Sequence, residues 1–107
     1  MEIKILSANR NKVEAEIDEV ETVCYRLTEE EKVNWDTRDT RWFAEKAHTE
    51  NNHFIHAQED IKELLDTAID EYNDIDEREM KHYVKEMRTS RNNYIRYITL
   101  FEALKDE

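Results

Sequence analysis

The sequence contains no glycine and no proline, and only one cysteine among its 107 residues. An average chain of this length would carry roughly seven glycines and five prolines. Without them, β-hairpins, phosphate-binding loops and Rossmann turns lose the residues that they usually need. Helices can be joined without them, because Asn and Asp tolerate the left-handed conformation at a helix end and Ser, Thr and Asp cap helix starts. The composition therefore predicts an all-α fold in a single domain.

The single cysteine and the lack of a long apolar stretch narrow the class of protein further. Cys24 has no second cysteine with which to form an internal disulfide, and its place in an apolar stripe predicts a small core residue. No stretch approaches the roughly 18 apolar residues that a membrane span needs. The amino terminus, MEIKILSANRNK, also lacks the basic lead and apolar run of a secretory signal. We therefore expect a cytoplasmic protein without a membrane span.

Acidic side chains dominate the sequence. The 27 Asp and Glu residues against 16 Lys and Arg residues give a formal net charge of −11. Most of the excess lies in residues 1–80, which argues against nucleic acid as a partner. The carboxy-terminal part carries a basic run that consists of Lys81, Lys85, Arg88, Arg91 and Arg96. We interpret this run as a solvated helix face, with an acidic partner or a phosphate backbone as the alternative.

Apolar spacing predicts three helices within residues 1–107. After an extended lead-in at residues 1–6, a first helix at about 7–34 is indicated by a stripe with spacings of four and three, which consists of Val13, Ile17, Val20, Cys24 and Leu27. A second helix at about 39–73 is indicated by an exact period of seven in Ala47, Phe54, Ile61, Ala68 and Ile75. A break of this helix at Asn51-Asn52 is the alternative.

The apolar register slips after Ile75, which predicts a turn at residues 73–76 and a third helix at about 76–105. Asn73 would end the second helix and Asp76 would begin the third. One long helix with a local phase shift is the alternative. The predicted fold is therefore an elongated antiparallel helical hairpin with a third, carboxy-terminal helix, similar to a three-helix bundle.

Residues 34–40, NWDTRDT, are rich in the short polar residues that form turns. We expect the chain to reverse here, with Trp35, Thr37 and Trp42 as turn residues. Core packing is the favoured interpretation for both tryptophans, because aromatic side chains bury a large area. Residues 28–31, TEEE, match a capping box, which we interpret as a kink or restart in the first helix.

The most strongly patterned stretch is residues 61–76, IKELLDTAIDEYNDID. Its apolar positions cover about three in seven, which is typical of a helix that packs against more than one neighbour. We predict that this face binds a partner through Ile61, Leu64, Leu65, Ala68, Ile69 and Tyr72.

Three of the four histidines follow a glutamate at the Glu-x-x-His spacing of di-iron helical bundles: Glu45 and His48, Glu50 and His53, Glu79 and His82. Such a site also needs glutamates on the apolar stripes, and the predicted helices carry none there. Serine is too scarce to indicate a nucleophile. We therefore expect no catalytic residues, no metal and no cofactor, and we interpret the motifs as solvated polar faces.

A Trp-containing turn between two long helices, with Tyr-x-x-x-Asp at the end of the second, resembles the WxG-type small helical proteins of type VII secretion. The MEIKI opening and the polar first helix are similar to the small helical proteins encoded beside LXG toxins. In this resemblance, Trp35-Asp36-Thr37 stands at the Trp-x-Gly turn, with Thr37 in place of the glycine. Tyr72 and Asp76 stand at the export motif, and the alternative is that Tyr72 packs in the seam beside a turn at Asp76.

The resemblance implies a non-enzymatic adaptor that binds the helical amino-terminal domain of a larger client, such as an LXG toxin. The two would form a hetero-oligomer, and the adaptor would present the client to the secretion machinery. Export with the client, by a route that needs no signal peptide, is then expected. Two alternatives come from the residues themselves. One is an acidic helical inhibitor of a basic cleft, such as an immunity protein or a nucleic-acid mimic, and the less favoured one is a Glu-x-x-His metal bundle.

Overall fold

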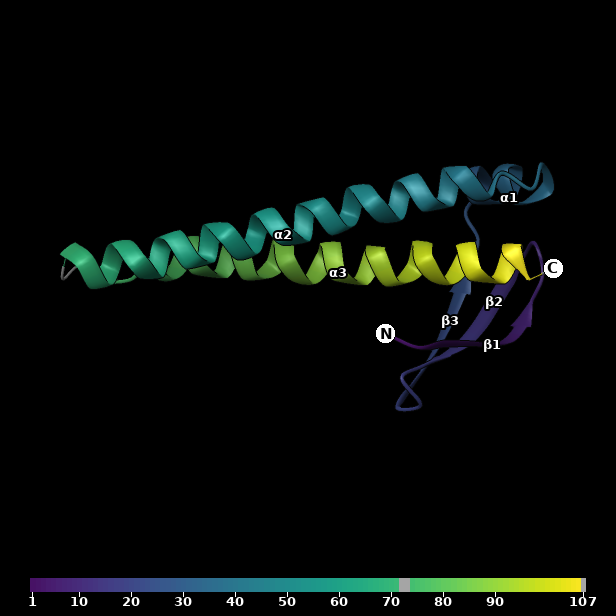
Figure 1. Ribbon diagram of the computed structural model, residues 1–107, viewed down its shortest axis with the longest axis horizontal. Helices are drawn as coiled ribbons and strands as arrows, with labels where there is room; N and C mark the ends of the chain where they lie inside the picture. Colours follow the sequence, from purple (N-terminus) through teal and green to yellow (C-terminus); the bar gives the residue numbers. More distant parts are fainter. Residues whose placement is uncertain (72–73, 107) are drawn as a thin grey trace. The chain divides into compact units, whose positions relative to one another are not determined.

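The computed structural model describes residues 1–71 and 74–106, which form three strands followed by three helices (Figure 1). The elements are β1 Ile3–Ala8, β2 Lys12–Ile17, β3 Glu21–Arg26, α1 Glu29–Asp36, α2 Thr40–Glu71 and α3 Glu77–Lys105. The fold is α+β, so the all-α prediction is wrong. An antiparallel sheet of order β1-β2-β3 occupies most of the region predicted as a first helix at 7–34.

Both hairpin turns of the sheet are built without glycine. Between β2 and β3, Asp18 and Glu19 take positive φ angles of 52° and 61°, and the amide of Val20 donates to the carbonyl of Ile17 over 3.1 Å. Positive φ at both central residues is the requirement of a type I′ turn. Between β1 and β2, the side chain of Asn9 accepts from the amides of Asn11 and Lys12. Asp18 and Glu19 therefore take the conformation that usually requires glycine, and the Asn9 side chain stabilises the other turn, so hairpins form although the composition predicts none.

The two faces of the sheet differ in polarity. Val13, Ala15 and Ile17 alternate along β2 and are buried, whereas Cys24 on β3 pairs with Glu14 on the opposite face and is exposed. The prediction of Cys24 as a core residue is therefore wrong. Val20, another residue of the predicted helical stripe, lies in the turn after Glu19 and is 89% exposed.

The chain divides into two compact units. We call residues 1–47 with 95–107 the sheet unit, and residues 48–94 the helix-pair unit. Both α2 and α3 belong partly to the sheet unit and partly to the helix-pair unit. The predicted ranges of 39–73 and 76–105 for the last two helices are close to those of α2 and α3. α2 continues through Asn51-Asn52, so the alternative of a break there is also wrong.

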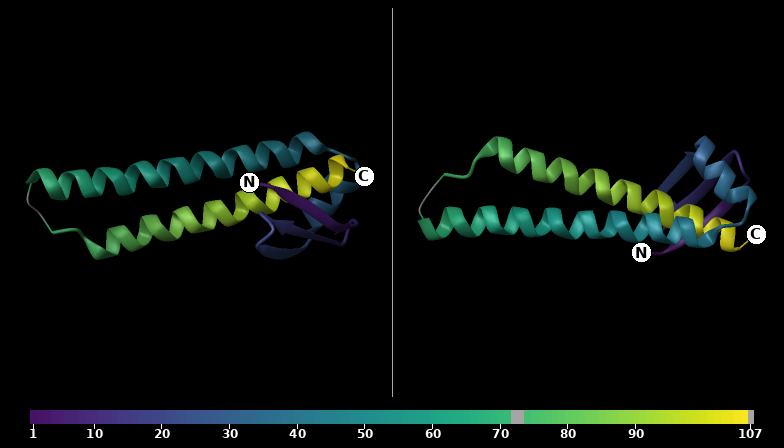
Figure 2. Two further views of the ribbon diagram at one scale, coloured as in Figure 1. Left: turned by 60° about the horizontal axis from the view of Figure 1, so that its bottom comes forward. Right: turned by 90° about the horizontal axis from the view of Figure 1, so that it is seen from above.

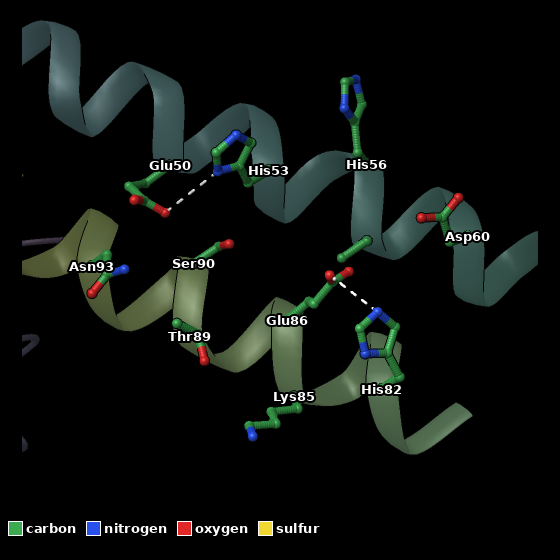
Figure 3. Close-up of a pocket in the computed structure, with 11 residues that line it drawn as sticks. Glu50, His53, His56, Asp60, His82, Lys85, Glu86, Thr89, Ser90 and Asn93 are labelled. Atoms are coloured by element: carbon green, nitrogen blue, oxygen red, sulfur yellow. Dashed lines mark ion pairs between the residues drawn. The ribbon is translucent and has the colours of Figure 1, made fainter. Parts of the chain in front are cut away.

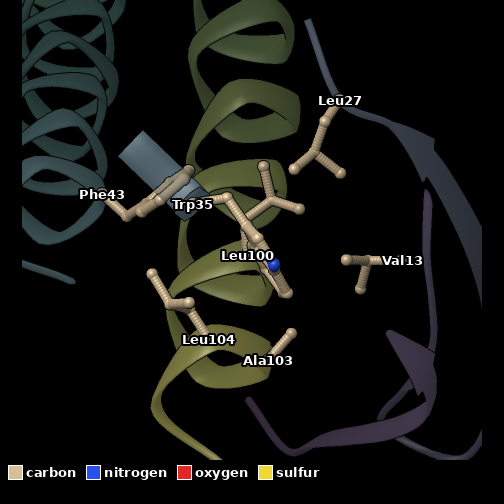
Figure 4. Close-up of a cluster of buried hydrophobic side chains, with 7 residues drawn as sticks. All are labelled: Val13, Leu27, Trp35, Phe43, Leu100, Ala103 and Leu104. Carbon is tan, nitrogen blue, oxygen red and sulfur yellow. The ribbon is translucent and has the colours of Figure 1, made fainter. Parts of the chain in front are cut away.

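The sheet unit contains a hydrophobic core between the sheet, α1, the start of α2 and the end of α3 (Figure 4). Its buried members are Val13, Leu27, Trp35, Phe43, Leu100, Ala103 and Leu104. Trp42 is half-buried and lies edge-on to Phe43 and Tyr97, with ring centroids 4.9 and 6.1 Å away. The prediction that both tryptophans pack in the core is thus confirmed for Trp35 and, at the edge of the core, for Trp42.

The predicted turn at residues 34–40 joins α1 to α2. Thr37 is the C-cap of α1, and its amide donates to the carbonyl of Val33. Arg38 then takes the left-handed conformation with a φ of 57°, and the carboxylate of Asp39 accepts from the amide of Trp42 in the first turn of α2. The chain therefore turns at residues 37–39, within the predicted stretch, and Thr37 is a turn residue as predicted. Trp35 and Trp42 are not, because they lie in α1 and α2.

The capping box at residues 28–31 begins α1 and also holds a buried ion pair. The hydroxyl of Thr28 accepts from the amide of Glu31, and the Glu31 carboxylate accepts from the amide of Thr28. Arg96 of α3 donates to both carboxylate oxygens of Glu31 and, over 2.7 Å, to the carbonyl of Arg26. Burial raises the pKa of Glu31, but the hydrogen bonds from Arg96 and Thr28 outweigh it and lower the pKa below its ordinary value.

In the helix-pair unit, the parts of α2 and α3 run antiparallel (Figure 2). Asp76 caps α3, because its carboxylate accepts from the amides of Arg78 and Glu79 over 2.9 and 3.3 Å. The predicted C-cap, Asn73, lies outside the described residues. Within residues 1–71 and 74–106, no helix is long and apolar enough to cross a membrane, as the sequence predicts.

Candidate protein-interaction surface

The helix-pair unit buries very little apolar surface. Among its described residues, Ala57 is the only hydrophobic side chain that is fully buried. The half-buried ones are Phe54, Ile61, Leu64, Ala68, Met80, Tyr83, Val84, Met87 and Tyr94. Four more are exposed, which are Ile55, Leu65, Ile69 and Ile75. The sheet unit therefore has a core, whereas the helix pair leaves its apolar side chains partly in water.

Polar side chains line a groove on one face of the helix pair (Figure 3). The groove has a volume of about 570 Å³ and receives Glu50, His53, His56, Ala57 and Asp60 from α2. From α3 it receives His82, Lys85, Glu86, Thr89, Ser90 and Asn93. Three histidines and three carboxylates thus lie on this face, which we call the polar face.

The opposite face of the helix pair is apolar. At about 100° per residue, Leu65 and Ile69 of α2 lie away from the polar face, and so do Met80, Val84 and Met87 of α3. The half-buried Phe54 and Ile61 lie at its margin, within about 40° of Glu50. None of these seven side chains lines the polar groove. We call this set the apolar face. It extends over both helices and is the candidate interaction surface of the protein.

The predicted partner-binding residues divide between this face and the space between the helices. Ile61, Leu65 and Ile69 belong to the apolar face, and Ile69 is 71% exposed. Leu64 lines a shallow hollow together with Glu79 and Tyr83 of α3, and Ala68 is half-buried. Tyr72 lies outside the described residues. The α3 members Met80, Val84 and Met87 were not predicted as partner-binding, although the four-and-three spacing that revealed Ile61 to Ile69 is present there too.

Charges of opposite sign flank the apolar face. On α2 the exposed flank is mainly acidic and includes Glu59, Glu63, Asp66 and Asp70, with Lys62 among them. On α3 the predicted basic run is exposed at Lys81, Lys85, Arg88 and Arg91, and a hollow of about 400 Å³ on α3 is lined by Lys81, Lys85 and Arg88 beside Val84. Arg96 is the exception, since it binds the buried Glu31 in the sheet unit. Four of the five predicted basic residues therefore form an exposed stripe.

The Glu-x-x-His motifs do not converge. Glu50 lies 3.7 Å from His53, but His82 pairs with Glu86 over 3.2 Å, and Glu79 instead accepts from the hydroxyl of Tyr83. His48 contacts Asn52 rather than Glu45, which pairs with Arg41. In the part of the chain that the structure describes, no group of three or more His, Cys, Asp or Glu side chains is arranged to hold a metal ion. On the polar face, the pairs Glu50–His53 and His82–Glu86 thus each lie within a single helix.

The export motif that the resemblance suggests is described only at its second position. Asp76 uses its carboxylate to cap α3, as the alternative interpretation of this residue predicted. The other position, Tyr72, is outside the described residues. The helical hairpin that the resemblance implied is also replaced by a sheet at residues 3–26.

Comparisons of this chain with protein-family models, with curated proteins and with solved structures gave no match.

Proposed function

We propose that this protein is a non-enzymatic interaction protein, and that its helix-pair unit binds α-helices of another chain through the apolar face. The observation that carries the proposal is that the described residues of 48–94 form no buried core, whereas the sheet unit has a well-packed one. Two amphipathic helices cannot bury their apolar sides without a further layer of structure. A partner would supply that layer.

The shape of the apolar face favours helices as the partner elements. Its side chains follow helical spacing on both α2 and α3, so the ridges of one further helix, or of two, can pack along the same direction. Full burial of one Ile or Leu side chain contributes about 1.5–3 kcal/mol. Leu65 and Ile69, which are 38% and 71% exposed, are the side chains of the apolar face that a partner would bury most.

A larger helical client is the partner that we propose, and the helical amino-terminal domain of an LXG-type toxin is one with the required shape. In this proposal the protein is an adaptor that keeps the client's apolar helices covered and accompanies it to a secretion machine. The proposal rests on the apolar face and not on the helical-hairpin fold that the resemblance implied.

An acidic inhibitor of a basic cleft is the second candidate, because the flank of α2 carries exposed carboxylates from Glu59 to Asp70. The two functions differ in their response to salt. An apolar interface keeps its affinity as ionic strength rises, whereas binding by exposed carboxylates weakens steeply.

The test is co-expression of the protein with the helical domain of a candidate client, followed by measurement of the dissociation constant. Ile69→Glu is expected to raise the constant at least about tenfold, because it places a charge where an aliphatic side chain is buried, and tenfold corresponds to 1.4 kcal/mol. Val20→Glu is the matched control, since Val20 is an exposed aliphatic residue of the sheet unit. Equal effects of the two variants, or binding that disappears in 0.5 M salt, would count against the proposal.

A further inference from the structure

We infer that, in the absence of a client, the apolar face is covered by the apolar face of a second copy of this chain, so that two helix pairs form a four-helix bundle. This inference rests on the proposed function, since it names a partner for the same surface. It also assigns an orientation: a two-fold axis parallel to the helices, which places α2 of one copy against α3 of the other.

The charges beside the apolar face are self-complementary in this orientation alone. The flank of α2 in residues 48–71 is mainly acidic, with Lys62 as an exposed exception, and α3 in residues 77–94 carries the exposed basic stripe together with the exposed Glu77, Glu79 and Glu86. An axis parallel to the helices brings each acidic flank against a basic one, twice in the dimer. An axis perpendicular to the helices would instead place α2 against α2, with carboxylates facing carboxylates, which is unfavourable.

The charges also match in their level along the helices. Glu50 and Asn93 lie at one end of the polar groove, and Asp60 and Glu63 line a hollow with Glu79 and Tyr83. Because the two helices run antiparallel, one residue forward along α2 corresponds to one residue back along α3 at the same level. By this relation Glu63 is level with Lys81, whereas Arg88 lies about one helical turn beyond the level of Glu59. Because an axis parallel to the helices preserves level, Glu63 would face Lys81 of the second copy, and the long side chain of Arg88 would reach along one helical turn toward Glu59.

A dimer of this kind can form despite the negative net charge of the chain. The formal charge of −11 would oppose self-association if the acids were spread evenly over the surface. The excess of acids on α2 and the basic stripe of Lys81, Arg88 and Arg91 on α3 make the local interaction attractive where the two copies meet. The apolar centre supplies the stabilisation, and the flanks select the orientation.

The experiment is a charge exchange followed by sedimentation equilibrium of the full chain, whose monomer mass is 13.0 kDa. Variant A carries Lys81→Glu and Arg88→Glu, and variant B carries Glu59→Lys and Glu63→Lys; all four positions are exposed. We expect the wild type to be a dimer, and each variant alone to dissociate with a constant at least tenfold higher. A mixture of A and B should restore the dimer, because both contacts in the mixed dimer then join opposite charges.

Circular dichroism of each variant controls for folding. A dimer that resists both charge exchanges, or one that the mixture does not restore, would refute the two-fold orientation. A wild-type monomer at 100 µM would refute the inference as a whole. If that monomer still binds a helical client in a manner that Ile69→Glu weakens, the proposed function stands without a second copy; if it binds none, both fail.

Discussion

Replacement of Arg96 by Met should destabilise the sheet unit strongly, because it leaves the carboxylate of Glu31 buried without its ion partner. The side chain of Glu31 is 3% exposed and that of Arg96 is 24% exposed. Met keeps most of the aliphatic stem of Arg96, so packing changes little and the lost charge dominates. The same substitution removes the hydrogen bond to the carbonyl of Arg26 and the guanidinium that lies 5.3 Å from the ring of Tyr25.

The expected loss in the free energy of unfolding is about 3 kcal/mol. Removal of one partner from a buried pair costs roughly 3–5 kcal/mol. We take the lower end, because a quarter of the Arg96 side chain reaches water and the cavity that it leaves can admit solvent. For a domain of this size, a loss of that order would lower Tm by more than about 10 °C. Urea unfolding followed by circular dichroism measures the loss, provided that the m-value is unchanged.

Glu31→Gln supplies the pH test of the same pair. Because the pKa of Glu31 is lower in the folded chain than its ordinary value of 4.5, the charged form stabilises the fold above that value. This stabilisation is lost as pH falls through the folded pKa. The wild type should therefore exceed Glu31→Gln in stability by about 1–2 kcal/mol at pH 7, and the difference should shrink below pH 4.5. A cost of Arg96→Met below 1 kcal/mol, or a difference for Glu31→Gln that stays constant down to pH 3, would refute the reasoning.

Two further substitutions probe single polar groups. Thr99→Val should raise the free energy of unfolding by up to about 1 kcal/mol, because Thr99 is completely buried and, within the described residues, its hydroxyl has no hydrogen-bond partner. Thr99→Ala is the control and should lower the free energy of unfolding. If urea unfolding shows that Thr99→Val is less stable than the wild type, the hydroxyl does form a hydrogen bond. Asp76→Ala should cost about 1 kcal/mol in the first turn of α3, where its carboxylate accepts from the amides of Arg78 and Glu79. Hydrogen exchange of these two amides measures the loss of protection. Asp76→Asn should reduce the protection by only a few tenths of the energy lost in Asp76→Ala. Equal exchange rates in the wild type and both variants would contradict a capping role.

The two long helices could be predicted from the sequence because their signals are local and unopposed. A period of seven runs from Ala47 to Ala68 without a competing pattern, and α2 extends over this whole stretch. Asp76 begins α3 as its position before an acidic first turn predicts. The capping box at residues 28–31 was also correctly located, but it begins a new helix and does not restart an earlier one.

The sheet could not be separated from a helix by the apolar pattern that we used. Val13 and Ile17 fit a spacing of four, but with Ala15 between them they equally fit the alternation of a strand, and β2 adopts the second. The missing glycines seemed to exclude hairpins. That inference failed at Asp18 and Glu19, which take the left-handed conformation themselves. Such residues cost more free energy than glycine in that conformation. Two hydrogen bonds to Glu2 help to offset the cost: the amide of Asp18 donates to the carbonyl of Glu2, and the carboxylate of Asp18 accepts from the amide of Glu2.

The candidate surface was predicted on one helix only. The sequence predicts an apolar seam at Ile61 to Ile69, but it does not reveal which of these residues turn toward α3. Leu64 lies near Tyr83, whereas Leu65 and Ile69 remain exposed. The division depends on which side of α2 faces α3, and that is fixed only when both helices are placed in three dimensions.

Stability and association reside in different parts of the chain, which makes the two sets of variants independent. Substitutions at Glu31, Arg96 and Thr99 change the sheet unit, whose core is buried without help from another molecule. Substitutions at Ile69 and in the charged flanks change exposed side chains of the helix-pair unit. Because sites without shared interaction partners usually act additively, a variant of the sheet unit should lower Tm without altering a dissociation constant measured below its unfolding transition. Ile69→Glu should raise the dissociation constant and leave Tm unchanged at concentrations where the protein is dissociated. Above the dissociation constant, association itself stabilises the folded helices, so Ile69→Glu should lower Tm only as protein concentration rises. An effect of Ile69→Glu on Tm that is the same at every protein concentration would mean that the apolar face is part of the fold and not a binding surface.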